Sequence, residues 1–238
     1  MNILQLLSFG DTGWGMALLK AAGMTILLTF AALLVGAVFG SLVAAAKLSR
    51  RRSLRWLGDL YSILFRGIPE LLVIYLFYFG GASVVSAVGH WFGGEGYINV
   101  PPFLVGALAV GLISGSYQAE VFRGAYLAVA KGELEAALAI GMSTAMRFRR
   151  VLVPQVMRYA LPGLGNVLQM SLKDSALISV IGLVELMRAS QVAAGSTRQY
   201  FTFYIVGAVL YLILTGLSGR LFGFAEARVR RTQRRQIP

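Results

Sequence analysis

Long apolar runs separated by short basic stretches form the main pattern of this sequence. Five runs are long enough to cross a membrane, and they predict spans at residues 21–46, 57–88, 102–129, 156–182 and 200–224. Basic residues gather after the first run, in the connection 130–155 and at the C-terminal end. Because arginine and lysine favour the cytoplasmic side, the pattern predicts an all-α integral membrane protein of five transmembrane helices, with its N-terminus outside and its C-terminus inside.

The order of charge around the first run indicates a retained helix. Ala44-Ala45-Ala46 resembles a signal-peptide cleavage site. A signal peptide carries its positive charge before the apolar run, whereas here the charge follows the run, at Lys47, Arg50, Arg51, Arg52 and Arg55. This helix is therefore expected to stay in the membrane, with the basic block in the cytoplasm.

Composition supports a membrane protein. The 238 residues are 57% hydrophobic and 13% charged, whereas soluble domains are about a quarter charged, and we expect a single transmembrane domain over 1–238. The net charge of +12 would indicate nucleic-acid binding in a soluble protein, but here its placement follows membrane topology. Without cysteine, and with His90 as the one histidine, disulfides, thiolate chemistry, His-rich metal sites and His-based triads are excluded.

The connection 130–155 is a charged island with a helical pattern. Its apolar positions recur at i, i+3, i+4 and i+7, namely Leu134, Ala137, Leu138 and Gly141. Glu133 and Glu135 suit the positive end of a helix dipole, Gly141 is a natural stop, and Ser143 can cap a second short helix that ends before Pro154. The pattern predicts a helix–turn–helix on the membrane surface that presents small residues; an ordinary amphipathic loop is the alternative.

The spacing in this island resembles a known signature. Glu135-Ala136-Ala137, three residues, Gly141, nine residues and then Val151-Leu152-Val153-Pro154 are similar to the loop of permease subunits of bacterial ABC importers. In that family the loop forms a coupling helix that inserts into a groove on the ATPase subunit. The resemblance implies ATPase-coupling residues at Glu135, Ala136, Ala137, Gly141, Val153 and Pro154.

Sequences around the island resemble the polar amino-acid branch of that family. Arg123-Gly124-Ala125 and the segment 128–132 lead into the loop as they do there, except that Ala130 stands where the family usually has proline. The Arg66-Gly67-Ile68-Pro69 segment and residues 173–182 also match that branch. The resemblance covers about residues 20–225.

Polar residues inside the predicted second and third spans are candidates for a solute pathway. Arg66-Gly67-Ile68-Pro69-Glu70 interrupts the second span, where proline removes a backbone donor, and such a break either lines a wet cavity or is a simple kink. In the third span one face carries Ser116, Tyr117, Glu120 and Arg123 at i, i+1, i+4 and i+7. An ionisable residue within a span costs about 2.5–3.5 kcal/mol and marks a functional site, unless Glu120 only pairs with Arg123 at i, i+3.

A polar stripe also runs along the predicted fourth span. Asn166, Gln169 and Lys173 recur at i, i+3 and i+7, beside Asp174, and a stripe of this kind faces either a pathway or a partner helix. The residues expected along a solute pathway are Arg66, Glu70, Ser116, Glu120, Asn166, Gln169, Lys173 and Asp174.

The resemblance implies a fold, a function and a set of partners. The fold is the type I ABC importer permease core. The chain resembles permeases for histidine, for lysine, arginine and ornithine, and for the opines octopine and nopaline. Such a permease sits in the bacterial inner membrane with a second, similar but non-identical permease, two ATPases and a periplasmic binding protein. The chain has no G-x-x-x-x-G-K-[ST] loop, so we expect no cofactor here and ATP and Mg²⁺ on the partner ATPase.

Two other classes remain as alternatives. An ion-coupled secondary transporter would also place polar residues in its spans, but it more often shows two inverted halves. A membrane scaffold would not need Glu70, Glu120, Lys173 and Asp174 in apolar surroundings. Close helix packing is predicted at three small-xxx-small pairs, which are Gly36/Gly40, Gly111/Gly115 and Gly219/Gly223.

Overall fold

The computed structural model describes residues 3–10, 13–81, 83–84 and 100–234, and every regular element in these ranges is a helix. Three long helices are apolar enough to cross a membrane: α2 (Gly15–Leu48), α6 (Pro102–Ala128) and α11 (Tyr200–Arg234). Two bent helix pairs raise the number of candidate spans to five. The all-helical fold predicted from the apolar runs is therefore confirmed.

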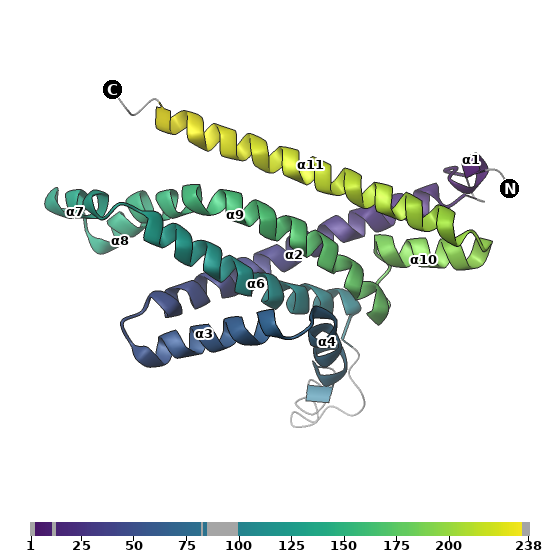
Figure 1. Ribbon diagram of the computed structural model, residues 1–238, viewed down its shortest axis with the longest axis horizontal. Helices are drawn as coiled ribbons and strands as arrows, with labels where there is room; N and C mark the ends of the chain where they lie inside the picture. Colours follow the sequence, from purple (N-terminus) through teal and green to yellow (C-terminus); the bar gives the residue numbers. More distant parts are fainter. Residues whose placement is uncertain (1–2, 11–12, 82, 85–99, 235–238) are drawn as a thin grey trace.

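Helices α2 and α6 form the centre of the molecule, and α9 (Val153–Asp174) packs beside them along the same long direction (Figure 1). Glycines allow the close approach of α2 and α6. A Cβ added at Gly40 would lie 3.0 Å from the carbonyl oxygen of Gly115 and 2.9 Å from Gln118 Cβ. Gln118 Nε2 then donates across the contact to the carbonyl of Leu33 at 3.2 Å.

The predicted close packing thus holds for the glycine pairs of α2 and α6. It does not hold for the third pair, on α11. A Cβ added at Gly223 would meet nothing within 4 Å, and one at Gly219 would meet only Gln169 Nε2, at 3.6 Å. In the described chain, no other helix packs closely against α11 at these two glycines.

The second predicted span is broken where the sequence placed its interruption. Helix α3 (Arg52–Gly67) ends before Ile68 and Pro69, and α4 (Glu70–Tyr75) starts after them, followed by a π-helical turn η1 (Leu76–Gly80). Ile68 is extended because proline disfavours a helical residue before it. The two helices meet at 104°, so the segment forms either a sharply broken span or a re-entrant loop. Residues 82 and 85–88 of the predicted span lie outside the described residues.

The fourth predicted span is also followed by a turn. Helix α9 tightens into a 3-10 segment η3 (Ser175–Ile181), Gly182 takes a left-handed conformation with φ +93°, and α10 (Leu186–Thr197) leaves at 50°. Residues 183–199 lie between the fourth and fifth predicted spans, and no helix was predicted there. The structure places a packed helix there, with Ala189, Ala193 and Ala194 buried.

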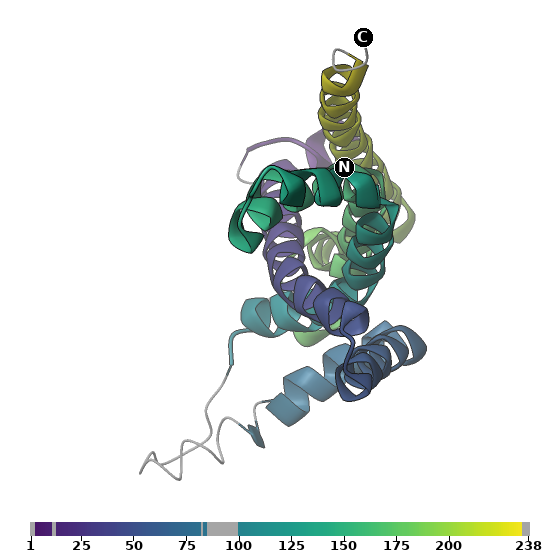
Figure 2. The ribbon, with the colours of Figure 1, turned by 90° about the vertical axis from the view of Figure 1, so that its left-hand side faces the viewer.

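The two ends of the molecule carry different elements. Helices α7 (Lys131–Ala139) and α8 (Thr144–Arg147) lie at the end toward which the C-terminus runs, whereas α10 and the short α1 (Ile3–Leu6) lie at the opposite end, near the N-terminus (Figure 1). Seen end-on, α3 and α4 lie on one side of the central helices and α11 on the other (Figure 2). Which end faces the cytoplasm stays a prediction from the charges.

Candidate coupling surface and solute pathway

The charged island forms the predicted helix–turn–helix. Helix α7 ends at Ala139, and Gly141 takes φ +81° while its N–H donates to the carbonyl of Leu138 at 2.9 Å. This left-handed glycine after the last turn is a common helix stop. The hydroxyl of Ser143 then accepts from the N–H of Met146 at 3.4 Å and caps α8. Both signals read from the sequence are confirmed.

The island differs from the expectation at its far end. A π-helical turn η2 (Phe148–Leu152) joins α8 directly to α9, so Val153 and Pro154 form the first turn of a long helix. Proline is tolerated there because the first N–H groups of a helix have no partner within it. Val153 and Pro154 are both exposed.

Three of the six expected coupling residues are exposed on α7 and on the turn that follows it. Glu135, Ala136 and Gly141 are exposed, but Ala137 is only 6% exposed and packs against the chain itself. Ala137 is therefore not presented to a partner as the sequence reading expected. The most exposed apolar side chain on this surface is Ile140, which is 74% exposed and which was not among the expected coupling residues.

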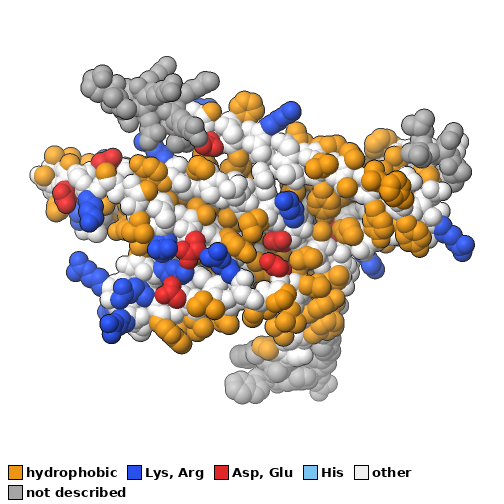
Figure 3. Space-filling model, in the orientation of Figure 1, with side chains coloured by type: hydrophobic (Ala, Val, Ile, Leu, Met, Phe, Trp, Pro, Cys, Tyr) orange, Lys and Arg blue, Asp and Glu red, His pale blue; other side chains and the backbone are white. Residues whose placement is uncertain are grey.

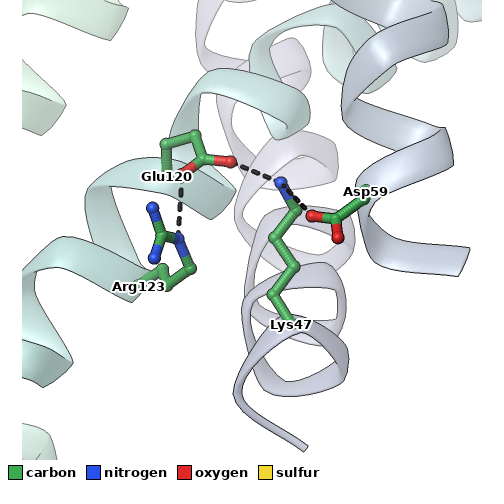
Figure 4. A network of polar contacts seen from close by, with 4 residues as sticks. All are labelled: Lys47, Asp59, Glu120 and Arg123. Carbon is green, nitrogen blue, oxygen red and sulfur yellow. Dashed lines mark hydrogen bonds and ion pairs between the residues drawn. The ribbon is translucent and has the colours of Figure 1, made fainter. Parts of the chain in front are cut away.

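Four charged side chains form a network where α2, α3 and α6 meet (Figure 4). Lys47 Nζ, in the last turn of α2, bonds to Glu120 Oε1 of α6 and lies 3.4 Å from Asp59 Oδ1 of α3. The other carboxylate oxygen of Glu120 accepts from Arg123 Nε at 3.0 Å. The pairing of Glu120 with Arg123 weighed from the sequence is present, and Lys47 is a second partner that the sequence did not reveal.

A polar cavity of about 720 Å³ opens beside this network, between α3 and α6. Arg66 lies over the ring of Tyr117, with 5.1 Å between the guanidinium carbon and the ring centroid. Both side chains line the cavity together with Lys47, Asp59, Ser62, Ile63, Gly67 and Glu120. Ser116 does not line it: its side chain is fully buried, and its hydroxyl donates to the carbonyl of Ile113 at 2.7 Å.

Glu70 and Asp174 form an acidic pair from two broken elements. Glu70 is the first residue of α4, Asp174 is the last of α9, and their carboxylates repel each other. Both are half-buried. Within the described residues neither carboxylate has a hydrogen bond or a salt bridge, and only the neighbouring charge of Lys173 attracts Asp174. Acidic side chains appear on the same face of the molecule as the basic ones (Figure 3).

The polar stripe of α9 faces α11. Gln169 lies against Gly219 of α11, and Lys173 lines a second cavity, of about 710 Å³, with Tyr204, Tyr211 and other residues of α10 and α11. Asn166 is exposed. Of the two interpretations of this stripe, a partner helix fits Gln169, whereas Lys173 lines a cavity and Asp174 lies close enough to Glu70 for their charges to interact.

One buried polar cluster was missed by the sequence reading. Glu185 is fully buried, and its carboxylate accepts from the N–H groups of Met187 and Arg188 at 2.8 Å, capping α10. The hydroxyl of Tyr211 donates to Glu185 at 2.8 Å, and Thr25 Oγ1 of α2 accepts from the N–H of Leu186 at 3.1 Å. The sequence signal for this cluster is an acidic residue at the start of a helix. It was missed because no helix was predicted in this segment.

The molecule combines long apolar helices with two sharp breaks, half-buried charges beside the breaks and a short helical pair at one end. Together these features define a membrane transport subunit. The chain belongs to the family described as "Binding-protein-dependent transport system inner membrane component", which matches residues 36–231. It is thus a permease subunit of an ABC importer, a class that works with a separate ATPase, a binding protein and a second permease.

Named relatives and a solved structure agree with this membership. The chain is 54% identical to the octopine transport system permease protein OccQ of Rhizobium meliloti, with 100% of both chains covered. It is 38% identical to the histidine/lysine/arginine/ornithine transport system permease protein HisQ of Escherichia coli, covering 91% of this chain and 94% of that one. A crystal structure of an amino acid ABC transporter with histidines superposes with a TM-score of 0.74 at 33% identity, covering 90% of this chain and 95% of that one.

Proposed function

We propose that this permease imports a cationic amino acid or an opine across the bacterial inner membrane. The similarity to permeases of octopine and of histidine/lysine/arginine/ornithine transport systems supports the solute class. Its N-terminus faces the periplasm and its C-terminus the cytoplasm, because the basic clusters then lie inside. Its partners are a second permease of similar but non-identical sequence, two ATPases and a periplasmic binding protein.

The observation that carries the solute class is the acidic pair of Glu70 and Asp174. Two half-buried carboxylates that repel each other, with no salt bridge in the described residues, are costly in a membrane protein. A cationic group between them would neutralise that repulsion. A guanidinium is suited to the task because its planar donors can bond carboxylates in bidentate fashion.

Basic side chains nearby would receive the solute's own carboxylate. Arg66 lines the open polar cavity four residues before Glu70, and Lys173 precedes Asp174. Arg123 is less suited, because its Nε already donates to Glu120. An opine presents two carboxylates, so Arg66 and Lys173 could each take one. Among the other pathway candidates, the exposed Asn166 would contribute neutral hydrogen bonds to the solute.

The exposed surface of α7 is the proposed contact with the ATPase. Glu135, Ala136 and Gly141 are exposed there, and crossing the membrane does not require an exposed helix of this kind. The small residues among them allow a partner to approach closely. Val153 and Pro154 support this surface as the first turn of α9. ATP and Mg²⁺ would be bound by the ATPase, and no cofactor by this chain.

Uptake into proteoliposomes tests the proposal. The permease is reconstituted with its second permease, its ATPase and its binding protein, and labelled histidine, arginine, octopine, nopaline and a neutral amino acid are offered in turn. We expect ATP-dependent uptake of at least one of these solutes, with stimulated ATP hydrolysis, and no effect of proton or sodium ionophores. Uptake that collapses with an ionophore, or uptake of neutral amino acids only, would overturn the proposal.

A further inference from the structure

The network of Lys47, Asp59, Glu120 and Arg123 lies between α7, the proposed coupling helix, and the α3–α4 break before Glu70. We propose that the Lys47–Glu120 pair is the joint that passes movement of α7, through α6, to α3 and the α3–α4 break. On this account Lys47 and Glu120 are positioning residues, and Glu120 does not contact solute. The inference rests on the proposed function of α7 as the ATPase contact.

The α2 side of the joint is built around a buried ammonium group. The side chain of Lys47 is only 7% exposed, yet it belongs to the last turn of α2, where a cation suits the negative end of the helix dipole. Helix α3 makes room for it at Gly58, since a Cβ added there would lie 2.8 Å from Lys47 Cγ. The lysine is thus clamped between α2 and α3.

On the α6 side, the pair is connected by continuous helix to the short link that precedes α7. Glu120 divides its two oxygens between Lys47 and Arg123, which fixes the orientation of its carboxylate. From Glu120 the helix continues without a break to Ala128, roughly 12 Å at 1.5 Å per residue. Only Val129 and Ala130, both extended, separate it from α7, and Val129 is buried. A displacement of α7 therefore reaches Glu120 directly.

Helix α3 is held to the same stretch of α6 at further points. The hydroxyl of Tyr61 donates to the carbonyl of Leu112 at 2.7 Å, and Arg66 lies over Tyr117, one turn before Glu120. Helix α3 ends at Gly67, and α4 starts three residues later at Glu70. Movement of α6 against α2 thus pulls on the break that positions the acidic pair.

Stability alone is a poor account of this network. A buried ion pair adds little net stability over apolar packing of the same shape, because both charges lose their hydration. Lys47 is buried, whereas Asp59 is 62% exposed, so the network runs from the interior to the edge of the open cavity. That placement suits a joint whose partners shift during transport.

The test compares Lys47→Met, Glu120→Gln and the double variant in the reconstituted transporter, with the matched control Lys20→Met. Lys20 is an exposed cation on the same helix, outside the network. Three quantities are measured: solute imported per ATP hydrolysed, the solute concentration at half-maximal uptake, and solute-independent ATP hydrolysis. Coupling networks contribute effects of roughly two- to thirtyfold. We expect imported solute per ATP to fall within this range in both single variants, with no further fall in the double variant.

The half-maximal concentration, the solute-independent hydrolysis and the Lys20→Met control should stay at wild-type values. A raised half-maximal concentration with unchanged solute per ATP would show that Glu120 meets solute, and would overturn the inference. So would unchanged values throughout. If the Glu120→Gln protein assembles poorly, the variants Asp59→Asn and Lys47→Arg replace it in the test. Asp59→Asn should lower the solute imported per ATP, whereas Lys47→Arg, which keeps the charge, should preserve it. Unchanged import with Asp59→Asn together with lowered import with Lys47→Arg would contradict the proposed role of the Lys47–Glu120 pair. Failure of the proposed function appears separately, as no ATP-dependent uptake in the wild type.

Discussion

The hydroxyl of Tyr211 on α11 donates a hydrogen bond of 2.8 Å to the fully buried carboxylate of Glu185. Glu185 also accepts from two backbone N–H groups at the start of α10, so a single carboxylate fastens α10 to α11. Leu186 adds a bond to Thr25 of α2. The bend after η3 is therefore fixed by polar contacts, in a segment that the sequence pattern placed between two predicted spans.

We predict that Tyr211→Phe destabilises the solubilised protein by about 1–3 kcal/mol, because a buried carboxylate loses a hydrogen bond. Tyr204→Phe is the matched control, since Tyr204 lies on the same helix and has no hydrogen bond within the described residues. Thermal unfolding in detergent measures both. Equal melting temperatures for the two variants would mean that the Tyr211–Glu185 bond contributes nothing to the fold.

Gly40→Ala should weaken the contact between α2 and α6. The added Cβ would lie 3.0 Å from the Gly115 carbonyl, and backbone cannot move aside as a side chain does, so we expect a loss of about 1–3 kcal/mol. Gly23→Ala on the same helix meets nothing within 4 Å and should be neutral or slightly stabilising, since alanine favours helix. Thermal unfolding distinguishes the two; a Gly40→Ala protein as stable as wild type contradicts the close packing.

The sequence predicted features that depend on local pattern. The break before Glu70 follows from the backbone restrictions of proline, and the turn after α7 follows from a glycine stop and a serine cap. These signals are contained in a few neighbouring residues, so they can be read without knowing the rest of the fold. The family signature rests on the same island.

Long-range pairing could not be predicted in this way. Lys47 belongs to a basic block that reads as a topology signal, and its partner Glu120 lies 73 residues further along the chain. Nothing in the sequence distinguishes a lysine that bonds a distant carboxylate from one that faces water. The same holds for Ala137, whose burial depends on how the rest of the chain packs against α7.

Gly141→Asp should leave the protein inserted but lower transport by its ATPase complex. A carboxylate would clash and lose its solvation in the proposed ATPase contact, and any side chain is strained at φ +81°, so Gly141→Ala is measured alongside to give the effect of that strain alone. Gly132→Asp is the matched control, because Gly132 lies in the first turn of α7, has open space around it and suits a negative charge. Co-purification of the ATPase and stimulated ATP hydrolysis are the measurements. Normal transport by the Gly141→Asp protein would remove this glycine from the ATPase contact.

The charges of the connections predict which side each one faces. A cysteine at Ser53, in the basic block, should be protected from an impermeant maleimide added to intact spheroplasts. A cysteine at Gly94 should react; Gly94 lies outside the described residues, so this expectation rests on the absence of lysine and arginine from 90–101. Because the chain has no native cysteine, the background is low. The opposite labelling would reverse the topology and the direction of import.

The most direct test of the account is uptake of a cationic solute by the reconstituted transporter when the acidic pair is neutralised. Asp174→Asn and Glu70→Gln keep shape and hydrogen-bonding capacity but remove charge. Hydrogen bonds to charged groups contribute about 1.5–3 kcal/mol, so each variant should lower uptake of labelled arginine or octopine by roughly ten- to a hundredfold. Yield of the complex and solute-independent ATP hydrolysis should not change. Wild-type uptake by both variants and by the double variant would contradict a cationic solute held by Glu70 and Asp174.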